Sequence, residues 1–273
     1  MRRSWMKAML AALAVAVVGG GCKKEDGDQS GAANSKLFVR MVDEPSPYGF
    51  LEINVDVRGV EVNITSISGN AAWVTLNAHP GVYNLLELAN GFERLIGDAT
   101  VPPGNITQVR LALGENNSVK LMAGNTLPLT IPAAGTAGLI INVNQWISVG
   151  QDFVLYLDFD AAHSVVPQSN LEFHLYPVLR GWIPAQTGGI TGGVNIVGPG
   201  IAAIAEKYIE PDVKYSTYVD LFLGRFMLRG LPPGKYRLMV YAVDSDIPFT
   251  IEDIEVTAGN LTDVGTVIIG QGI

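Results

Sequence analysis

The sequence predicts an all-β protein of two β-sandwich domains, a larger one followed by a smaller one. Three observations predict this fold class. Apolar residues recur at every second place or in short β-branched runs, which is the pattern of strands with a buried face. Gly, Pro, Asn and Asp separate these stretches, as turn residues do. The only segment that could hold a helical turn, Tyr83 to Gly97, is short.

Residues 1–21 have the layout of a secretory signal peptide. Arg2, Arg3 and Lys7 form a short positive region, and an uncharged apolar stretch follows from Ala8 to Val18. About eleven apolar residues rise only ~16 Å as a helix, whereas the hydrocarbon core of a bilayer requires about 20 residues. We therefore expect an export signal rather than a membrane span.

Cys22 is the single cysteine of the chain, and two glycines precede it directly. This arrangement resembles the bacterial lipobox, in which cleavage leaves a lipid-bearing cysteine as the first residue. Gly19 departs from the Leu, Val or similar residue that the lipobox usually has at that place. Stable membrane anchoring needs more than one lipid signal, which several acyl chains on one residue would supply. We expect lipid on Cys22.

Residues 22–35 are polar and small, and they predict a flexible tether. The charged residues Lys23, Lys24, Glu25 and Asp26 are similar to the signal that sends Bacteroidetes lipoproteins to the outer face of the outer membrane. We expect a protein that is lipid-anchored in the outer membrane. A body facing the cell exterior and one facing the periplasm both stay open.

The chain is acidic, with 26 Asp and Glu against 18 Lys and Arg and a net charge of −8. This balance disfavours phosphate backbones, so we expect no nucleic-acid partner. A single cysteine cannot form an intramolecular disulfide, so the stability of the fold must come from packing.

The larger domain is predicted over residues 36–181 and the smaller over residues 190–273. Between them, from Gly181 to Gly193, Gly, Pro and Thr interrupt the strand pattern. The predicted strands before the break cover residues 37–42, 51–64, 72–78, 107–114, 138–144, 152–160 and 171–179; those after it cover residues 193–197, 201–209, 225–231, 235–243, 249–259 and 263–270.

A Pro-Pro-Gly segment leads into one strand of each domain. The first lies at residues 102–104 and the second at residues 232–234. Pro sets a φ near −65° and Gly accepts a positive φ, so each segment predicts a tight type II turn that feeds a strand. The residues around the two segments do not align further, so they are not a sequence repeat.

The smaller domain resembles the carboxypeptidase regulatory-like family, which has a transthyretin-like sandwich of seven strands. The motif Gly-x-Phe followed by Leu-Pro-x-Gly-x-Tyr is matched by Gly224, Phe226, Leu231, Pro232, Gly234 and Tyr236. Leu221 to Leu223 depart from the polar turn that this family usually has before the first glycine. The resemblance implies a non-catalytic domain, even where the family is attached to peptidases.

The larger region, from Leu37 to Val178, resembles the domain of unknown function 4382 family of exported bacterial lipoproteins. Five stretches occur in the order of that family: VRMVDEPSP, YNLLELANG, VPPGNITQVRLAL, LPLTIPAAGTAGLIIN and LDFDAAHSVV. This chain has Glu44 where the family usually has Ala, and Ala134 where it usually has Ser. The resemblance implies a fold and an exported location rather than an activity.

Two carboxylates near the end of one predicted strand are candidate site residues. Asp158 and Asp160 alternate with apolar residues, so both should point to the same face, ~6.6–6.8 Å apart along the strand. With Asp43 as a third oxygen ligand they could bind Ca²⁺. They could instead cap neighbouring turns, or act as a catalytic carboxylate pair.

The remaining chemical candidates are isolated in the sequence. His79, His163 and His174 have no second His or Cys at metal-ligand spacing. Ser164 follows His163, but neighbours on a strand point to opposite faces and cannot share a proton. Trp146 and Trp182 are candidate platforms for a sugar, with packing between the domains as the alternative.

These observations predict a non-catalytic binding or scaffolding protein of the cell envelope, without an enzymatic activity or a cofactor other than the candidate calcium. Its ligand would be a polysaccharide, a peptide or a partner outer-membrane protein, and the lipid on Cys22 would tie it to the membrane. The ends of β-sandwiches present loops that carry recognition. Two alternatives remain: a hydrolase that uses acidic residues on envelope or dietary polymers, and a purely structural spacer.

Overall fold

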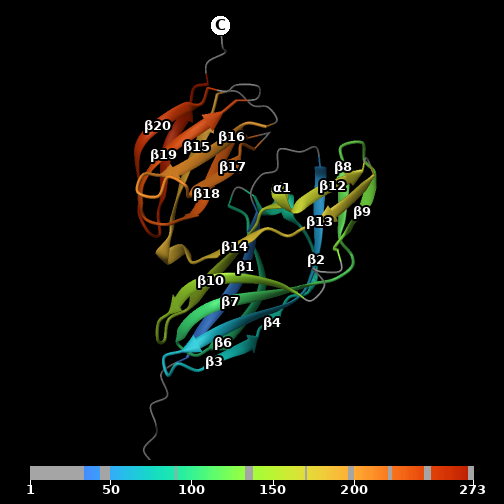
Figure 1. Cartoon of the computed structure of the whole chain (residues 1–273), viewed down its shortest axis with the longest axis vertical. Helices are drawn as coiled ribbons and strands as arrows, with labels where there is room; N and C mark the ends of the chain where they lie inside the picture. Colours follow the sequence, from blue (N-terminus) through green and yellow to red (C-terminus); the bar gives the residue numbers. More distant parts are fainter. Residues whose placement is uncertain are drawn as a thin grey trace, which may run out of the picture. The chain divides into compact units, whose positions relative to one another are not determined.

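A computed structural model describes residues 34–43, 50–89, 91–132, 138–169, 171–195, 200–220, 223–242 and 247–269. The chain divides into residues 1–31 and residues 32–273, and all of the described residues lie in the second unit. The signal peptide, Cys22 and nearly all of the tether lie outside the described residues. Within them the protein is all-β, which confirms the predicted fold class (Figure 1).

The first sheet of the larger sandwich has five strands. Their order is β14 (Leu179–Trp182), β11 (Phe153–Phe159), β1 (Ser35–Asp43), β6 (Arg94–Val101) and β4 (Asn77–Ala78). The central strand β1 is parallel to β11 and antiparallel to β6.

The second sheet of the larger sandwich has nine strands. The path runs β10 (Leu139–Ile147), β7 (Gly104–Leu113), β2 (Phe50–Ser66), β8 (Ser118–Leu121), β9 (Thr126–Thr130), β13 (Glu172–Leu175) and β12 (Val165–Ser169). Two further strands, β3 (Ala71–Thr75) and β5 (Gly81–Asn84), pair with β2.

The smaller sandwich has a three-stranded and a four-stranded sheet. The first has the order β18 (Arg225–Leu231), β15 (Gly188–Val194) and β21 (Leu261–Val267). The second has the order β17 (Lys214–Tyr218), β16 (Ala202–Lys207), β19 (Gly234–Tyr241) and β20 (Phe249–Val256).

Helical structure is limited to single turns in the described part of the chain. These are η1 (Leu85–Leu88), α1 (Ala161–Ser164) and η3 (Pro184–Gln186). The turn η1 falls in the segment where the sequence predicts one. No helix among the described residues has the length and apolar character needed to cross a bilayer.

Buried apolar side chains form two separate clusters, one in each sandwich. The larger cluster includes Leu37, Val39 and Met41, which alternate along β1 with less buried residues. The smaller cluster includes Phe226 and Tyr236. Because burying an apolar side chain contributes about 1.5–3 kcal/mol, these clusters supply the stability that a disulfide cannot.

The glycine-rich segment between the predicted domains is a strand and not an interruption. Strand β15 contains Gly188, Gly189 and Gly192 and is the central strand of its sheet. A Cβ on Gly189 would lie 2.4 Å from the carbonyl oxygen of Leu228, and one on Gly192 would lie 2.7 Å from Phe226. Glycine is uncommon in strands, so the composition did not indicate a strand here. The glycines are present because neighbouring groups approach the backbone of β15 too closely for a side chain.

The two sandwiches share one strand order. Strands β6-β1-β11 of the larger sandwich correspond to β18-β15-β21 of the smaller, and β3-β2-β7-β10 correspond to β17-β16-β19-β20. In each set of seven strands the first strand, β1 or β15, lies between two others. It is parallel to the last strand of the set and antiparallel to the strand that ends at Pro-Pro-Gly. The larger sandwich adds strands to this common set of seven.

The Pro-Pro-Gly segments cross from one sheet to the other. The first joins β6 to β7 and the second joins β18 to β19, and each pair of strands belongs to different sheets. The φ angles are 159° at Gly104 and 151° at Gly234, far from the value of about 80° that a type II turn requires. The predicted turn type is therefore wrong, because each glycine already begins a strand of the opposite sheet.

Candidate functional site

An ion pair between a buried carboxylate, Asp158, and a partly exposed guanidinium, Arg180, lies at the centre of the candidate site. The antiparallel register of β11 and β14 sets the two residues opposite each other. Arg180 donates from Nε at 2.9 Å and from Nη2 at 2.6 Å to the same oxygen, Oδ2 of Asp158. Asp158 is only 4% exposed. The guanidinium therefore offsets the cost of removing this carboxylate from water.

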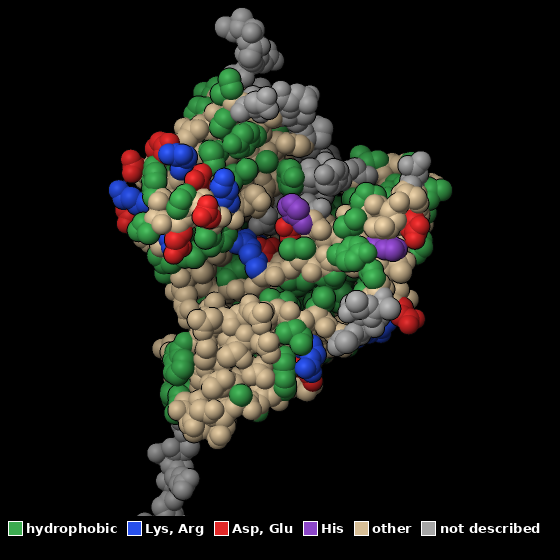
Figure 2. Space-filling view, in the orientation of Figure 1, with side chains coloured by type: hydrophobic (Ala, Val, Ile, Leu, Met, Phe, Trp, Pro, Cys, Tyr) green, Lys and Arg blue, Asp and Glu red, His purple; other side chains and the backbone are tan. Residues whose placement is uncertain are grey.

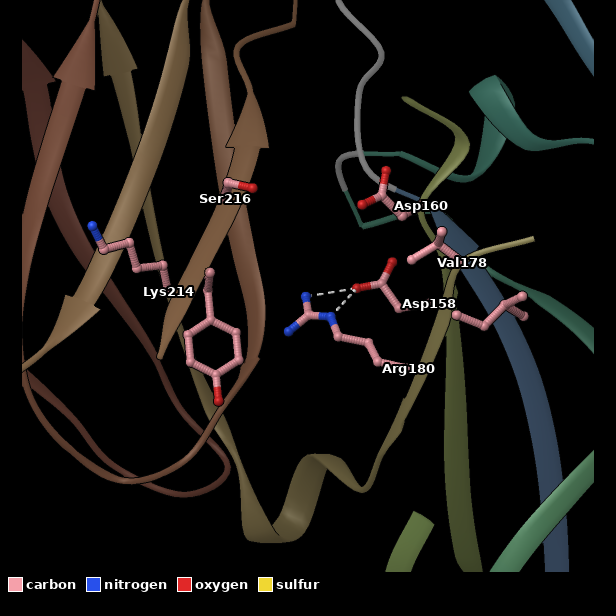
Figure 3. Close-up of a pocket in the computed structure, with 8 residues that line it drawn as sticks. Asp158, Asp160, Val178, Arg180, Lys214 and Ser216 are labelled. Atoms are coloured by element: carbon pink, nitrogen blue, oxygen red, sulfur yellow. Dashed lines mark hydrogen bonds and ion pairs between the residues drawn. The ribbon is translucent and has the colours of Figure 1, made fainter. Parts of the chain in front are cut away.

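A cavity of about 200 Å³ lies beside this ion pair. It is lined by Asp158, Asp160, Val178, Leu179, Arg180, Lys214, Tyr215 and Ser216 (Figure 3). The guanidinium of Arg180 lies 5.3 Å from the centre of the Tyr215 ring, and burial raises the pKa of the Tyr215 hydroxyl. Both candidate carboxylates thus reach one cavity, whose cations and aromatic ring the sequence did not predict.

Asp160 is engaged by the helical turn that follows it. Its Oδ1 accepts a hydrogen bond of 3.0 Å from the backbone N–H of His163, and its Oδ2 lies 2.7 Å from Nδ1 of the same histidine. The buried Ser164 hydroxyl donates to the backbone oxygen of Asp160 at 2.5 Å and accepts from the N–H of Val178 at 2.9 Å. Asp160 therefore caps a turn, and Ser164 has its hydroxyl bonded to backbone.

His163 and Ser164 lie in a helical turn and not in a strand, in which neighbouring side chains would point to opposite faces. This turn is α1, which Asp160 begins by accepting the His163 N–H. Short polar residues such as Asp favour this role, because their oxygens satisfy backbone donors that a helix start leaves free. The isolation of Ser164 from a base thus follows from its backbone bonds and not from strand alternation.

The structure does not bring Asp43 to Asp158 and Asp160. Strands β1 and β11 are parallel, with Val42 beside Asp158 and Asp43 beside Phe159. Side chains alternate between the two faces of a sheet, so Asp43 and Asp158 point to opposite faces. Asp43 accepts the N–H of Ala161 at 3.1 Å. In the described part of the chain no group of three or more His, Cys, Asp or Glu could hold a metal ion.

The three histidines lie apart, each beside one acidic residue. The nearest acidic oxygens belong to Asp98 for His79 at 3.3 Å, Asp160 for His163 at 2.7 Å and Glu172 for His174 at 3.2 Å. A transition-metal site requires several such ligands around one point.

Trp182 is almost fully buried and lines a small cavity of about 140 Å³. It is 6% exposed, and its ring centroid lies 4.5 Å from that of Tyr156. Arg229 lies 5.9 Å from the Trp182 ring, and a Cβ added to Gly230 would lie 2.7 Å from it. The packing alternative therefore describes this residue.

Tyr156 links Trp182 to an ion pair that the sequence did not predict. Its hydroxyl donates to Glu93, which accepts from Arg40 at 2.5 Å. Burial, and next the hydrogen bond to Glu93, raise the pKa of Tyr156 to about 12. Burial also lowers the pKa of Arg229. These residues are too far apart in the chain for spacing to reveal them.

Trp146 is the aromatic candidate that solvent can reach. It lies on β10, at the end of the nine-stranded sheet, and is 50% exposed. Its neighbour across the ladder is Asn105 on β7.

Comparison with solved structures finds only distant likeness. The Bacillus anthracis TIE protein has a TM-score of 0.20 and 13% identity, with 87% of this chain and 34% of that chain covered. The minor pilin GBS52 of Streptococcus agalactiae has a TM-score of 0.24 and 9% identity, with 88% and 98% covered. A fimbrial protein of Bacteroides ovatus has a TM-score of 0.26 and 10% identity, with 87% and 50% covered.

The chain thus spans about a third of the TIE protein and half of the fimbrial protein. TM-scores this low establish no shared function. No curated protein has a significantly similar sequence. The family model described as "Domain of unknown function (DUF4382)" matches residues 34–177, which is more than half of the chain. This match agrees with the five stretches that resemble that family, and the protein belongs to the DUF4382 family.

Proposed function

We propose that this protein is a non-catalytic binding or scaffolding protein of the cell envelope. One observation carries the proposal: the groups that catalysis would need are engaged in bonds within the fold. Asp158 is paired with Arg180, Asp160 caps α1, and the Ser164 hydroxyl is bonded to backbone groups. A general acid or nucleophile must instead lie within reach of a substrate with its proton or lone pair available.

The location follows from the first residues of the sequence. The positive region, the apolar stretch and Cys22 support an exported lipoprotein, and Lys23 to Asp26 support the outer membrane as its destination. Lipid on Cys22 and the tether of residues 22–35 would then hold both sandwiches near the membrane surface.

The smaller sandwich is proposed to be a carboxypeptidase regulatory-like domain. Three residues of the matched motif, Phe226, Leu231 and Tyr236, are fully buried in its core. The strands from β15 to β21 also number the seven of the transthyretin-like sandwich. Such a domain adds packing and surface rather than chemistry.

Each alternative function has one observation that bears on it. The cavity at Asp158 and Asp160 is what a hydrolase would require, but the bonds of both carboxylates within the fold argue against a catalytic pair. A pure spacer would expose no aromatic platform, and the half-exposed Trp146 argues against it.

The lipid anchor can be tested by labelling cells with an alkyne fatty acid. The wild-type protein should carry the label and sediment with outer membranes, whereas Cys22→Ala should carry none. Lys23→Ala keeps the attachment site and is the matched control, so it should be labelled like the wild type. Label on Cys22→Ala, or none on the wild type, would refute the anchor. Protease treatment of intact cells then distinguishes exposure on the cell surface from a periplasmic body.

A further inference from the structure

One outer sheet face of the larger sandwich is rich in side-chain amides. On β2 the buried residues Val60, Val62 and Ile64 face the core, so Glu61, Asn63 and Thr65 face outward. The register continues this outer face across β3, β7 and β10. Figure 2 shows a broad area of uncharged polar side chains and backbone over the strands that Figure 1 labels β7 and β10.

The amides on this face are ordered by bonds between neighbouring strands. Gln108 donates from Nε2 to Oδ1 of Asn142 at 3.0 Å, and Asn105 donates from Nδ2 to Oδ1 of Asn144 at 2.8 Å. The Thr107 hydroxyl donates to Oδ1 of Asn63 at 3.1 Å. A primary amide has two N–H donors and an oxygen with two lone pairs. Each of these bonds therefore fixes an amide and leaves it further donors and acceptors.

The charge of this face is balanced, although the chain has a net charge of −8. Where β2 pairs with β3, and along β3, β7 and β10, the charged side chains are Glu61 and Arg110, which form an ion pair at 2.6 Å. Nearer the start of β2, Glu52 and Arg58 are also charged, and they pair with Lys120 and Asp56. Arg110 also lies 4.1 Å from the centre of the Trp73 ring and covers it. A ligand of this face would consequently not be selected by its charge.

Trp146 provides an apolar surface among the amides. It extends outward from β10 beside Asn105, and half of it is exposed. Trp73 is covered by Arg110 and Trp182 is stacked on Tyr156. By contrast, the Trp146 ring contacts no aromatic ring or cation within the described ranges. A rigid ring with an open face gives a large contact area at a small cost in conformational entropy.

We propose that this face binds a neutral polysaccharide. The amide face is defined by Asn63, Asn105, Gln108, Asn142, Asn144 and Trp146. A sugar ring presents an apolar C–H face beside hydroxyl groups that both donate and accept, which complements an indole ring beside fixed amides. The proposal names the ligand class of the binding protein proposed above and rests on that function.

The test is affinity electrophoresis of the full-length protein in non-ionic detergent. The gels contain glucomannan, xyloglucan, arabinoxylan or dextran as neutral probes, and polygalacturonate as the anionic comparison. At least one neutral polysaccharide should slow the wild-type protein and polygalacturonate should not. Trp146→Ala should weaken binding about tenfold or more, as truncation of an aromatic anchor does. Gln108→Ala, which removes one ordered amide pair, should weaken binding about threefold to tenfold.

Ile140→Ala is the matched control, because Ile140 is also exposed on β10 but has no ring. It should change the affinity less than about twofold, and Trp146→Tyr should restore part of the binding. Circular dichroism confirms that each variant is folded. The proposal is overturned if no neutral polysaccharide binds, or if Ile140→Ala weakens binding as much as Trp146→Ala. A protein that is labelled on Cys22 yet binds no glycan would overturn this inference alone and leave the envelope proposal intact.

Discussion

The two sandwiches arrange seven strands in the same order, but they differ in what surrounds those strands. In its described residues, the smaller sandwich consists of the seven strands. The larger sandwich has three groups of additional elements. Before β6 it adds β4, β5 and η1, and after β7 it adds β8 and β9. After β11 it adds α1 and β12 to β14. The cavity at Asp158 lies beside one of these additions, whereas the amide face lies on the common strands. Similar frameworks therefore carry different surfaces.

The Pro-Pro-Gly segments that cross between sheets also differ between the two sandwiches. At equivalent places after Pro-Pro-Gly the larger sandwich has Ile106 and the smaller has Tyr236, both fully buried. The Tyr236 hydroxyl donates to the backbone oxygen of Pro232 at 2.7 Å. A Cβ on Gly104 would lie 2.3 Å from the backbone oxygen of Thr65, whereas one on Gly234 would meet the end of Lys207 at 3.2 Å. The first crossing is held by close backbone packing and the second by a side-chain bond.

The largest expected effect is the loss of stability in Gly104→Ala, which should exceed that in Gly234→Ala. Gly104→Ala should lower the free energy of unfolding by about 4 kcal/mol, because it combines overpacking against backbone with a strained φ. Gly234→Ala should cost about 1–2 kcal/mol, since the flexible Lys207 side chain can move. Urea denaturation followed by tryptophan fluorescence reports the larger sandwich, which contains Trp73, Trp146 and Trp182. Circular dichroism during the same denaturation reports the smaller sandwich as well. Equal losses for the two variants would show that the crossings do not differ.

The second prediction compares an ion pair whose carboxylate is buried with an ion pair that is exposed on both sides. Arg180→Met leaves the buried Asp158 carboxylate without its guanidinium and should cost about 2–3 kcal/mol. Arg237 pairs with Glu252 at 2.9 Å on the surface of the smaller sandwich. Arg237→Met should cost much less stability, because both groups of this pair stay hydrated. Chemical denaturation measures both. A small loss for Arg180→Met would mean that water reaches Asp158 and that the pair is not structural.

The third prediction concerns the hydroxyl of Tyr236. Tyr236→Phe keeps the buried ring and removes the bond to the Pro232 oxygen, so it should cost about 1 kcal/mol. Tyr215→Phe is the control, because the Tyr215 hydroxyl makes no hydrogen bond within the described part of the chain. Circular dichroism during urea denaturation measures both variants. If both lose the same stability, the bond does not hold the second crossing.

The smallest effect appears only in alkaline solution. Burial raises the pKa of Tyr156 to about 12 and also raises that of Tyr236, from an ordinary value of 10.0. The unfolded chain therefore releases these protons first. The stabilisation is complete below pH 10 and is lost as the pH rises through the folded-state values.

The measurement is the free energy of unfolding from neutral pH to about pH 12. Tyr156→Phe should flatten the decline seen by tryptophan fluorescence, which reports the larger sandwich. Tyr236→Phe should flatten the part seen only by circular dichroism. A decline that neither variant changes would assign the alkaline loss to other groups.

Local patterns were enough to predict many of the strands and the placement of Asp158 and Asp160 near the end of β11. They missed other strands, among them β6, β8, β9, β12 and β17. Alternation along β11 predicted that Leu155 and Leu157 are buried, and that Asp158 faces away from them. It could not show that Asp43 faces the other way, because that depends on the register of β1 against a strand more than a hundred residues later. The burial of Trp182 likewise depends on Arg229 and Gly230 from another sheet.

By itself the sequence determined the all-β class, the two sandwiches and the residues of the Pro-Pro-Gly crossings, because side-chain alternation and backbone freedom are local properties of the chain. The tertiary structure alone decided which sheets the crossings join, that Asp158 meets Arg180, and that Gln108 meets Asn142 on an outer face. These outcomes depend on the pairing of distant strands, and a shift of one residue in register would turn every side chain to the opposite face.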